Sequence, residues 1–162
     1  MYKKPNFKYK NLKRAQQSKK ERLYKRIIKM IEQKNIIFLT FTFNDKVYKK
    51  TSAKTQERYI KAFLNEQANE YILNCDYGTT NTKRRHFHAL IKPKDEINGV
   101  NLKAYKYGRI SAIFLNKSVR FKNTNKDLNK CAEMFLNHII KPSTQNTRVI
   151  FSRKLKKEIN NI

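Results

Sequence analysis

The chain has few residues of several kinds: three glycines, three prolines, two cysteines and no tryptophan among 162 residues. Cys75 and Cys131 are far apart and have no Cys-x-x-Cys spacing, which argues against a zinc knuckle or a disulfide framework and predicts two reduced, buried thiols. The scarcity of glycine argues against the phosphate-binding loop of a nucleotide-binding unit. A chain of this length predicts one domain with one core.

Acidic residues are also scarce, since 12 Asp and Glu stand against 38 Lys and Arg, for a net charge of +26. Such self-repulsion destabilises a folded chain unless a polyanion relieves it, so nucleic acid is the expected partner. The longest apolar run, residues 36–43, is too short to span a bilayer, and the N-terminal region has no apolar signal-peptide segment. We therefore expect a cytoplasmic protein without a membrane partner.

The hydrophobic pattern predicts helices and strands in alternation. Helices are expected at 18–34, with Ser18 as N-cap and Glu21 as its capping-box partner, and at 53–69 and 127–141. The expected strands are 36–43, 71–77, 85–91, 109–115 and 147–152, with turns at 44–45 and 78–83. This order predicts an α+β fold: an antiparallel four- to five-stranded sheet with helices packed on one face, as in ferredoxin-like and RNA-recognition-like domains. The expected domain covers 18–155, between a flexible basic arm at 1–17 and a basic tail at 156–162.

Two of the three histidines of the chain are placed two residues apart on the strand predicted at 85–91. Because side chains alternate along a strand, His86 and His88 face the same side, about 6.5 to 7 Å apart, and Phe87 faces the other. Two imidazoles placed in this way can share one metal ion, provided that a third group completes the site.

Asp76 is the candidate for this third ligand, because it ends the preceding strand and an antiparallel hairpin would bring it beside the histidines. Two imidazoles and one carboxylate suit Mn²⁺ or Mg²⁺ and leave positions for phosphate oxygens and water. A turn residue before Gly78 is an equally good interpretation of Asp76. Glu70 is a weaker candidate for the third metal ligand.

A threonine-rich strand, an acidic-Tyr-Gly step and a His-hydrophobic-His strand follow one another at residues 38–43, 76–78 and 85–91. In this order they resemble motifs I and II of rolling-circle replication initiators, which belong to the His-hydrophobic-His (HUH) endonuclease superfamily, from small phages and plasmids. Residues 107–110 and 148–155 resemble the downstream segments of that family, so the resemblance spans roughly 36–155.

The resemblance implies a protein that binds single-stranded or hairpin DNA, nicks one strand and so initiates rolling-circle replication or strand transfer. It also implies a divalent metal ion at the histidines, and a tyrosine on a helix after the sheet that attacks the scissile phosphate. A separate helicase has to unwind the duplex, because a chain of 162 residues leaves no room for a nucleotide-binding unit.

The helix that matches this tyrosine helix departs from the family pattern, because residues 132–141 contain no tyrosine. Phe135 is the preferred match to the nucleophile position, and Met134 is the alternative. His138 is a candidate for positioning a phosphate or acting as an acid, and Lys141 is a candidate for contacting the scissile phosphate. An ordinary surface histidine and a solvated lysine are the alternatives.

The missing tyrosine leaves several interpretations open. A substitution has removed the nucleophile, or another tyrosine such as Tyr105 or Tyr107 attacks, or the protein is an inactive relative that binds DNA as a regulator or competitor. An RNA-binding basic module, whose strand aromatics stack on bases, is a further alternative. The residues expected to contact nucleic acid are basic or hydroxyl-bearing: Lys3, Lys4, Thr40, Thr42, Lys83, Arg84 and Arg85.

Overall fold

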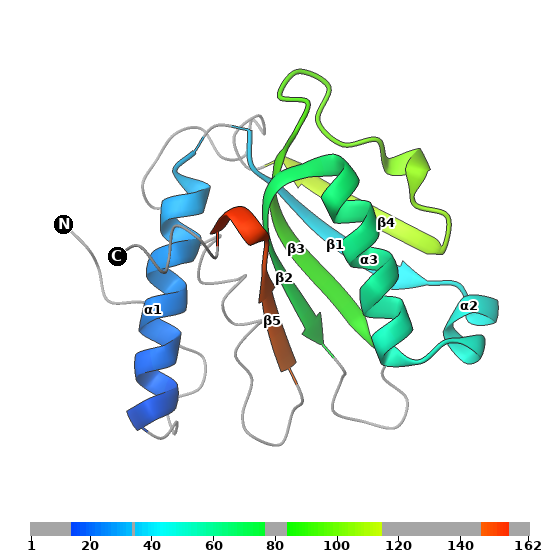
Figure 1. Cartoon of the computed structure of the whole chain (residues 1–162), viewed down its shortest axis with the longest axis horizontal. Helices are drawn as coiled ribbons and strands as arrows, with labels where there is room; N and C mark the ends of the chain where they lie inside the picture. The colour runs from blue at the N-terminus through cyan, green and yellow to red at the C-terminus, as the bar shows by residue number, and fades with distance from the viewer. Residues whose placement is uncertain (1–13, 34, 77–83, 115–146, 156–162) are drawn as a thin grey trace.

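The computed structural model describes residues 14–33, 35–76, 84–114 and 147–155. Its helices are α1 (Arg14–Ile31), α2 (Asp45–Lys50) and α3 (Ala53–Gln67), with a short 3-10 turn η1 (Leu102–Ala104). Its strands are β1 (Ile37–Phe43), β2 (Ala68–Asp76), β3 (His86–Pro93), β4 (Gly108–Phe114) and β5 (Thr147–Phe151). The strands form one open antiparallel sheet in the order β4-β1-β3-β2-β5 (Figure 1), which confirms the predicted α+β fold class.

The centre of the sheet is the β2–β3 hairpin, with β1 on the other side of β3. In this register Asp76 is the Cα partner of His86, and Asn74 is the partner of His88. On β1, Thr40 is the partner of His88. The strand that carries both histidines therefore lies between two neighbours that also present polar residues.

One face of the sheet packs against α3, which lies across it in Figure 1. Ile60, Phe63 and Leu64 of α3 are buried in one cluster with strand residues that include Phe41 and Phe87. Ser52 caps the helix, since its Oγ accepts a hydrogen bond from the Thr55 backbone N–H at 3.2 Å. This cluster is the main core, and it occupies the face opposite to the histidines.

The helix α1 packs against the other face of the sheet, near one end. Its apolar side chains form a second cluster with Phe38, Ile72 and Leu90, which are cross-strand neighbours on β1, β2 and β3. This corrects the prediction that the helices share one face. The strands are apolar on both faces at this end, so the second face also needs a helix to exclude water.

Two local predictions differ from the structure. Ser18 is not an N-cap, because α1 already begins at Arg14; the intervening residues are compatible with helix, so the Ser18 pattern lies inside it. The predicted turn after β1 is instead the start of α2, where the Asn44 side chain accepts a hydrogen bond from the Val47 N–H at 2.9 Å. Asn44 supplies the cap that the turn interpretation overlooked.

Some predictions lie outside the described residues: the helix at 127–141, the turn at 78–83 and the burial of Cys131. Cys75 is fully buried, as predicted. In the described part of the chain, every helix is too short or too polar to cross a membrane.

Replacing the cap of α3 gives a first test of the fold. We expect Ser52→Ala to lower the free energy of unfolding by about 1 kcal/mol, because the Thr55 N–H loses its acceptor. Ser52→Asp keeps an acceptor at this position and is expected to retain the stability. Urea denaturation of both variants measures the difference, and equal losses would show that the cap is not the cause.

Candidate functional site

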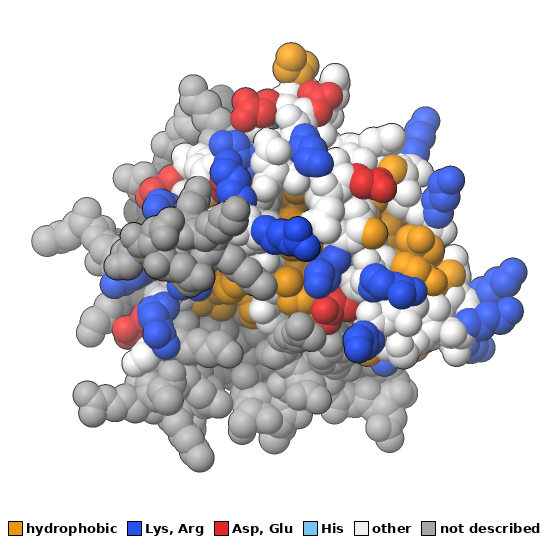
Figure 2. Space-filling model, in the orientation of Figure 1, with side chains coloured by type: hydrophobic (Ala, Val, Ile, Leu, Met, Phe, Trp, Pro, Cys, Tyr) orange, Lys and Arg blue, Asp and Glu red, His pale blue; other side chains and the backbone are white. Residues whose placement is uncertain are grey.

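On the sheet face opposite α3, polar side chains lie beyond the apolar end that α1 covers. Thr40 and Thr42 of β1 are opposite Ser111 and Arg109 of β4, and Thr40 is also opposite His88. Since directly opposed residues in an antiparallel sheet share a face, the two histidines and the two threonines form one polar surface. Figure 2 looks onto the α3 side, where Lys and Arg side chains are spread and no described histidine is visible.

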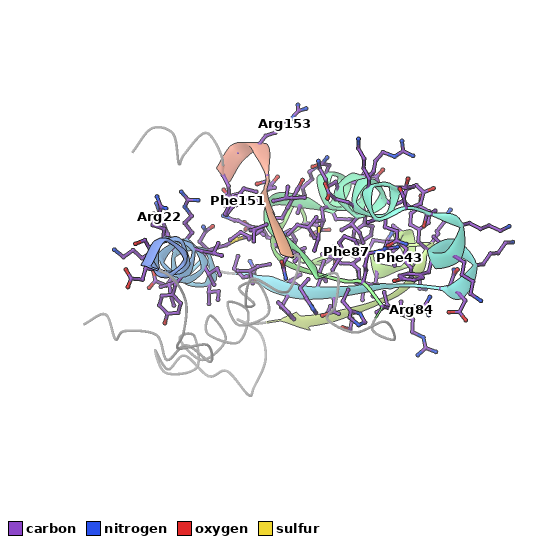
Figure 3. The ribbon with its side chains drawn as sticks, turned by 90° about the horizontal axis from the view of Figure 1, so that it is seen from below. Arg22, Phe43, Arg84, Phe87, Phe151 and Arg153 are labelled. Atoms are coloured by element: carbon purple, nitrogen blue, oxygen red, sulfur yellow. The ribbon has the colours of Figure 1, made fainter. Side chains whose placement is uncertain are left out.

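The labelled side chains of Figure 3 separate the two sides of the sheet. Phe43 and Phe87 point into the layer between the sheet and α3, whereas Arg84 points to the opposite side. Along β3, Phe87 thus points into the α3-side core, whereas His86 and His88 on either side of it point to the polar face, as the sequence predicts.

Within the described part of the chain, the side chains of Thr40 and Phe38 contact the ring of His88. Its Nδ1 lies 3.1 Å from the Thr40 hydroxyl oxygen, and its ring stacks on Phe38 with centroids 5.7 Å apart. The residue is buried, with 9% of its surface exposed. A proton on Nδ1, donated to Thr40, puts the lone pair of the ring on Nε2, which is the arrangement of a metal-ligating histidine with an outer-shell partner.

His86 is half-buried at the start of β3, directly opposite the backbone of Asp76. The predicted hairpin therefore brings these two positions together. Among the described side chains, no group of three or more His, Cys, Asp or Glu is close enough to hold a metal ion. The imidazole nitrogens nevertheless fit Mn²⁺ chemically, and a carboxylate oxygen would complete the set; the metal site stays a prediction.

Glu70 does not serve as the substitute ligand. It lies six residues before Asp76 on β2, which corresponds to about 20 Å along a strand. Its carboxylate is buried, with 4% of the residue exposed, and Oε1 accepts from Lys154 Nζ at 3.1 Å. This ion pair ties the residues after β5 to the far end of the sheet.

A basic hollow of about 570 Å³ opens beside His86. The lining residues come from the end of β1, the start of β3 and the start of β4: Thr42, Phe43, Asn44, Asp45, Arg84, Arg85, His86, Lys106, Gly108 and Arg109. Four of these side chains are Lys or Arg and one is Asp. A concave surface of this charge, next to an imidazole pair, suits a phosphate group.

The two arginines expected to bind nucleic acid have different surroundings. Arg85 Nε donates to Gln56 Oε1 at 2.9 Å, and the Arg85 backbone N–H donates to the Tyr48 hydroxyl at 3.3 Å. Gln56 is completely buried, so Arg85 ties the α2–α3 region to β3. Arg84 forms an ion pair with the exposed Asp45, and its guanidinium lies 4.4 Å from the centroid of the Tyr48 ring.

The two alternative tyrosines lie on the wrong side of the sheet for attack at the histidines. Tyr105 is 6% exposed in the α3-side core, and its hydroxyl donates to the Thr42 carbonyl oxygen at 3.0 Å. Burial raises its pKa well above the ordinary value, which disfavours the phenolate. Tyr107 packs against the same core and stacks on Tyr59 at 4.2 Å. Neither residue shares a face with His86.

Seven other predicted site residues lie outside the described part of the chain: Lys3, Lys4, Lys83, Met134, Phe135, His138 and Lys141. Conversely, sequence reasoning missed Asp45, Lys106 and Arg109 of the hollow. Of these three, only Arg109 could have been singled out from the sequence, because it begins a predicted strand. Its position beside Thr42 could not have been predicted, because the two residues are 67 positions apart in sequence.

Comparison of the chain with models of protein families, with curated proteins and with solved structures finds no match. The geometry of the polar face and the sequence motifs are therefore the features that indicate function.

Proposed function

We propose that this protein binds single-stranded DNA across the polar face and nicks it in a metal-dependent reaction that initiates rolling-circle replication. The observation that carries the proposal is the placement of His86 and His88 on one face of β3, beside a hollow lined by four cationic side chains. The motif order of a rolling-circle initiator supports the same function.

In this proposal, His86 and His88 hold the metal ion, with Asp76 as the third ligand. A divalent ion supplies Lewis-acid stabilisation of the scissile phosphate when it is bound. Thr40 fixes the ring of His88 through the 3.1 Å contact at Nδ1. Arg84, at the rim of the hollow, contributes positive charge toward the DNA backbone.

The surroundings of the strand aromatics argue against the RNA-binding module. Such a module stacks bases on exposed rings of its sheet. In the described strands, the aromatic side chains whose burial is known are packed in the two cores or, for Phe151, covered in part by Arg26 at 5.2 Å. The polar part of the other face carries the imidazoles of His86 and His88 and the hydroxyls of Thr40 and Thr42, of which His86 and the threonines are partly exposed.

A second candidate is a DNA-binding relative that does not nick, acting as a regulator or competitor. Two observations favour it: residues 132–141 contain no tyrosine, and Tyr105 and Tyr107 pack on the α3 side. In both candidates the same face binds the DNA. A separate helicase as partner and a cytoplasmic location stay predictions in both.

A covalent-adduct assay separates the two candidates. The unaltered protein, Phe135→Tyr and Met134→Tyr are incubated with labelled hairpin oligonucleotides and Mn²⁺, and each is repeated with EDTA. If the natural chain nicks, the unaltered protein forms a metal-dependent adduct on a denaturing gel through a tyrosine other than Tyr105 and Tyr107. An adduct with Phe135→Tyr alone, which adds the oxygen that a phenylalanine lacks, would show a site without its nucleophile and would overturn nicking by the unaltered protein. Tight binding without any adduct would favour the relative that does not nick.

A further inference from the structure

Asp45 is the one acidic residue among those that line the hollow beside His86. Its carboxylate is paired with Arg84, and the two side chains are 75% and 41% exposed. An ion pair this exposed is screened by solvent and contributes little to stability. Arg84 can therefore exchange Asp45 for another anion at small cost.

The guanidinium of Arg84 is nevertheless positioned by the protein. The ring of Tyr48 lies beneath it at 4.4 Å, and the guanidinium of Arg85 lies 4.8 Å from the centroid of the same ring. The Tyr48 hydroxyl accepts a hydrogen bond from the Arg85 backbone N–H at 3.3 Å, and Gln56 Nε2 donates to the Tyr48 carbonyl oxygen at 3.5 Å, so both ends of Tyr48 are held. A planar guanidinium held in this way can bind either a carboxylate or a phosphate with two parallel hydrogen bonds.

Lys106 and Arg109, at the β4 side of the hollow, are both exposed. Neither has a carboxylate partner within the part of the chain that the structure describes. Thr42 donates its hydroxyl to the Arg109 carbonyl oxygen at 3.3 Å, which orders the backbone there. Two cations without carboxylate partners among the described residues therefore line the same hollow as Arg84, whose counter-ion is exchangeable.

We propose that this hollow is a phosphodiester-binding site for the DNA segment next to the histidines, and that Asp45 occupies Arg84 until a backbone phosphate displaces it. The inference rests on the proposed function only in taking the bound strand to be single-stranded DNA. The volume of about 570 Å³ is in the range of ligand-sized sites, about 300 to 1,000 Å³. Binding at this site needs no metal ion.

The role of Lys106 and Arg109 is tested by fluorescence anisotropy with a labelled single-stranded oligothymidylate in EDTA, over a series of salt concentrations. We expect Lys106→Ala with Arg109→Ala to weaken binding about tenfold at low salt, and to reduce the slope of log affinity against log salt by about one for each charge removed. Lys103→Ala removes an exposed charge that does not line the hollow and is the matched control. If Lys103→Ala weakens binding as much per charge removed as the double variant does, the proposal is overturned.

The role of Asp45 is tested in the same assay. We expect Asp45→Asn to bind the oligonucleotide roughly threefold more tightly at low salt, because Arg84 no longer has to release a carboxylate. This gain is expected to disappear in the Arg84→Ala background. Glu96→Gln, an exposed acid outside the hollow, is the control for net charge. A gain of the same size in Glu96→Gln, or one that persists without Arg84, would overturn the exchange of partners.

These results are independent of nicking, because the assay contains no metal ion. Failure of the adduct assay together with the expected binding differences would leave the phosphodiester site intact in a protein that does not nick. Metal-dependent nicking by a protein whose hollow variants bind DNA normally would support the proposed function and overturn this inference.

Discussion

Replacing both histidines, by His86→Ala with His88→Ala, is expected to abolish Mn²⁺ binding and to lower nicking by more than about 100-fold, while affinity for single-stranded DNA persists. The physical reason is that both imidazoles project from one face of β3, so their removal takes away both proposed nitrogen ligands. The basic hollow and the other cations remain, and we expect them to supply the affinity for the DNA backbone. Titration with Mn²⁺, the nicking assay and anisotropy in EDTA measure the three quantities.

A positioning variant sharpens this test. Thr40→Val removes the hydroxyl that lies 3.1 Å from His88 Nδ1 and leaves both imidazoles in place. We expect Mn²⁺ affinity to fall about tenfold, as for other outer-shell partners of ligating histidines. His88 packs on Phe38, so thermal melting of the double variant checks that the sheet is intact. Nicking retained in a folded double variant would rule out the histidines as metal ligands.

The second large effect is expected at Gly108, the first residue of β4. A Cβ atom here would lie 2.1 Å from the Thr42 carbonyl oxygen and 2.7 Å from the Phe43 Cα, both of which belong to the backbone of β1. Since backbone atoms cannot rotate away, we expect Gly108→Ala to lower the free energy of unfolding by about 3 kcal/mol. Urea denaturation measures the loss.

Ser111→Ala is the matched control on the same strand. Ser111 is exposed and pairs with Thr40, and its truncation is expected to change stability by less than about 0.5 kcal/mol. A loss in Gly108→Ala no larger than in this control would show that β4 can move away from β1. In that case Gly108 does not set the distance between β4 and β1 beside the hollow.

Local periodicity was sufficient to predict most of the described fold. The strand at β1, the helix at α3 and the alternation of His86 with Phe87 follow from repeats of two and about 3.6 residues, which depend only on near neighbours. The same local signals failed where two of them competed. At Ser18 a capping pattern lay inside a longer helix, and at Asn44 a turn pattern was a helix cap.

The amino-acid sequence by itself determined the α+β class, the charge, and the shared face of the two histidines, because these depend on composition and on the pleat of one strand. Only the tertiary structure decided that α1 covers the second face and that Tyr105 belongs to the α3 side. It also decided that Arg85 donates a hydrogen bond to the buried Gln56, whereas Arg84 forms an ion pair with Asp45 at the hollow. These relations join residues that are distant in sequence, and they depend on strand order and on which apolar surfaces pair, which no local pattern encodes.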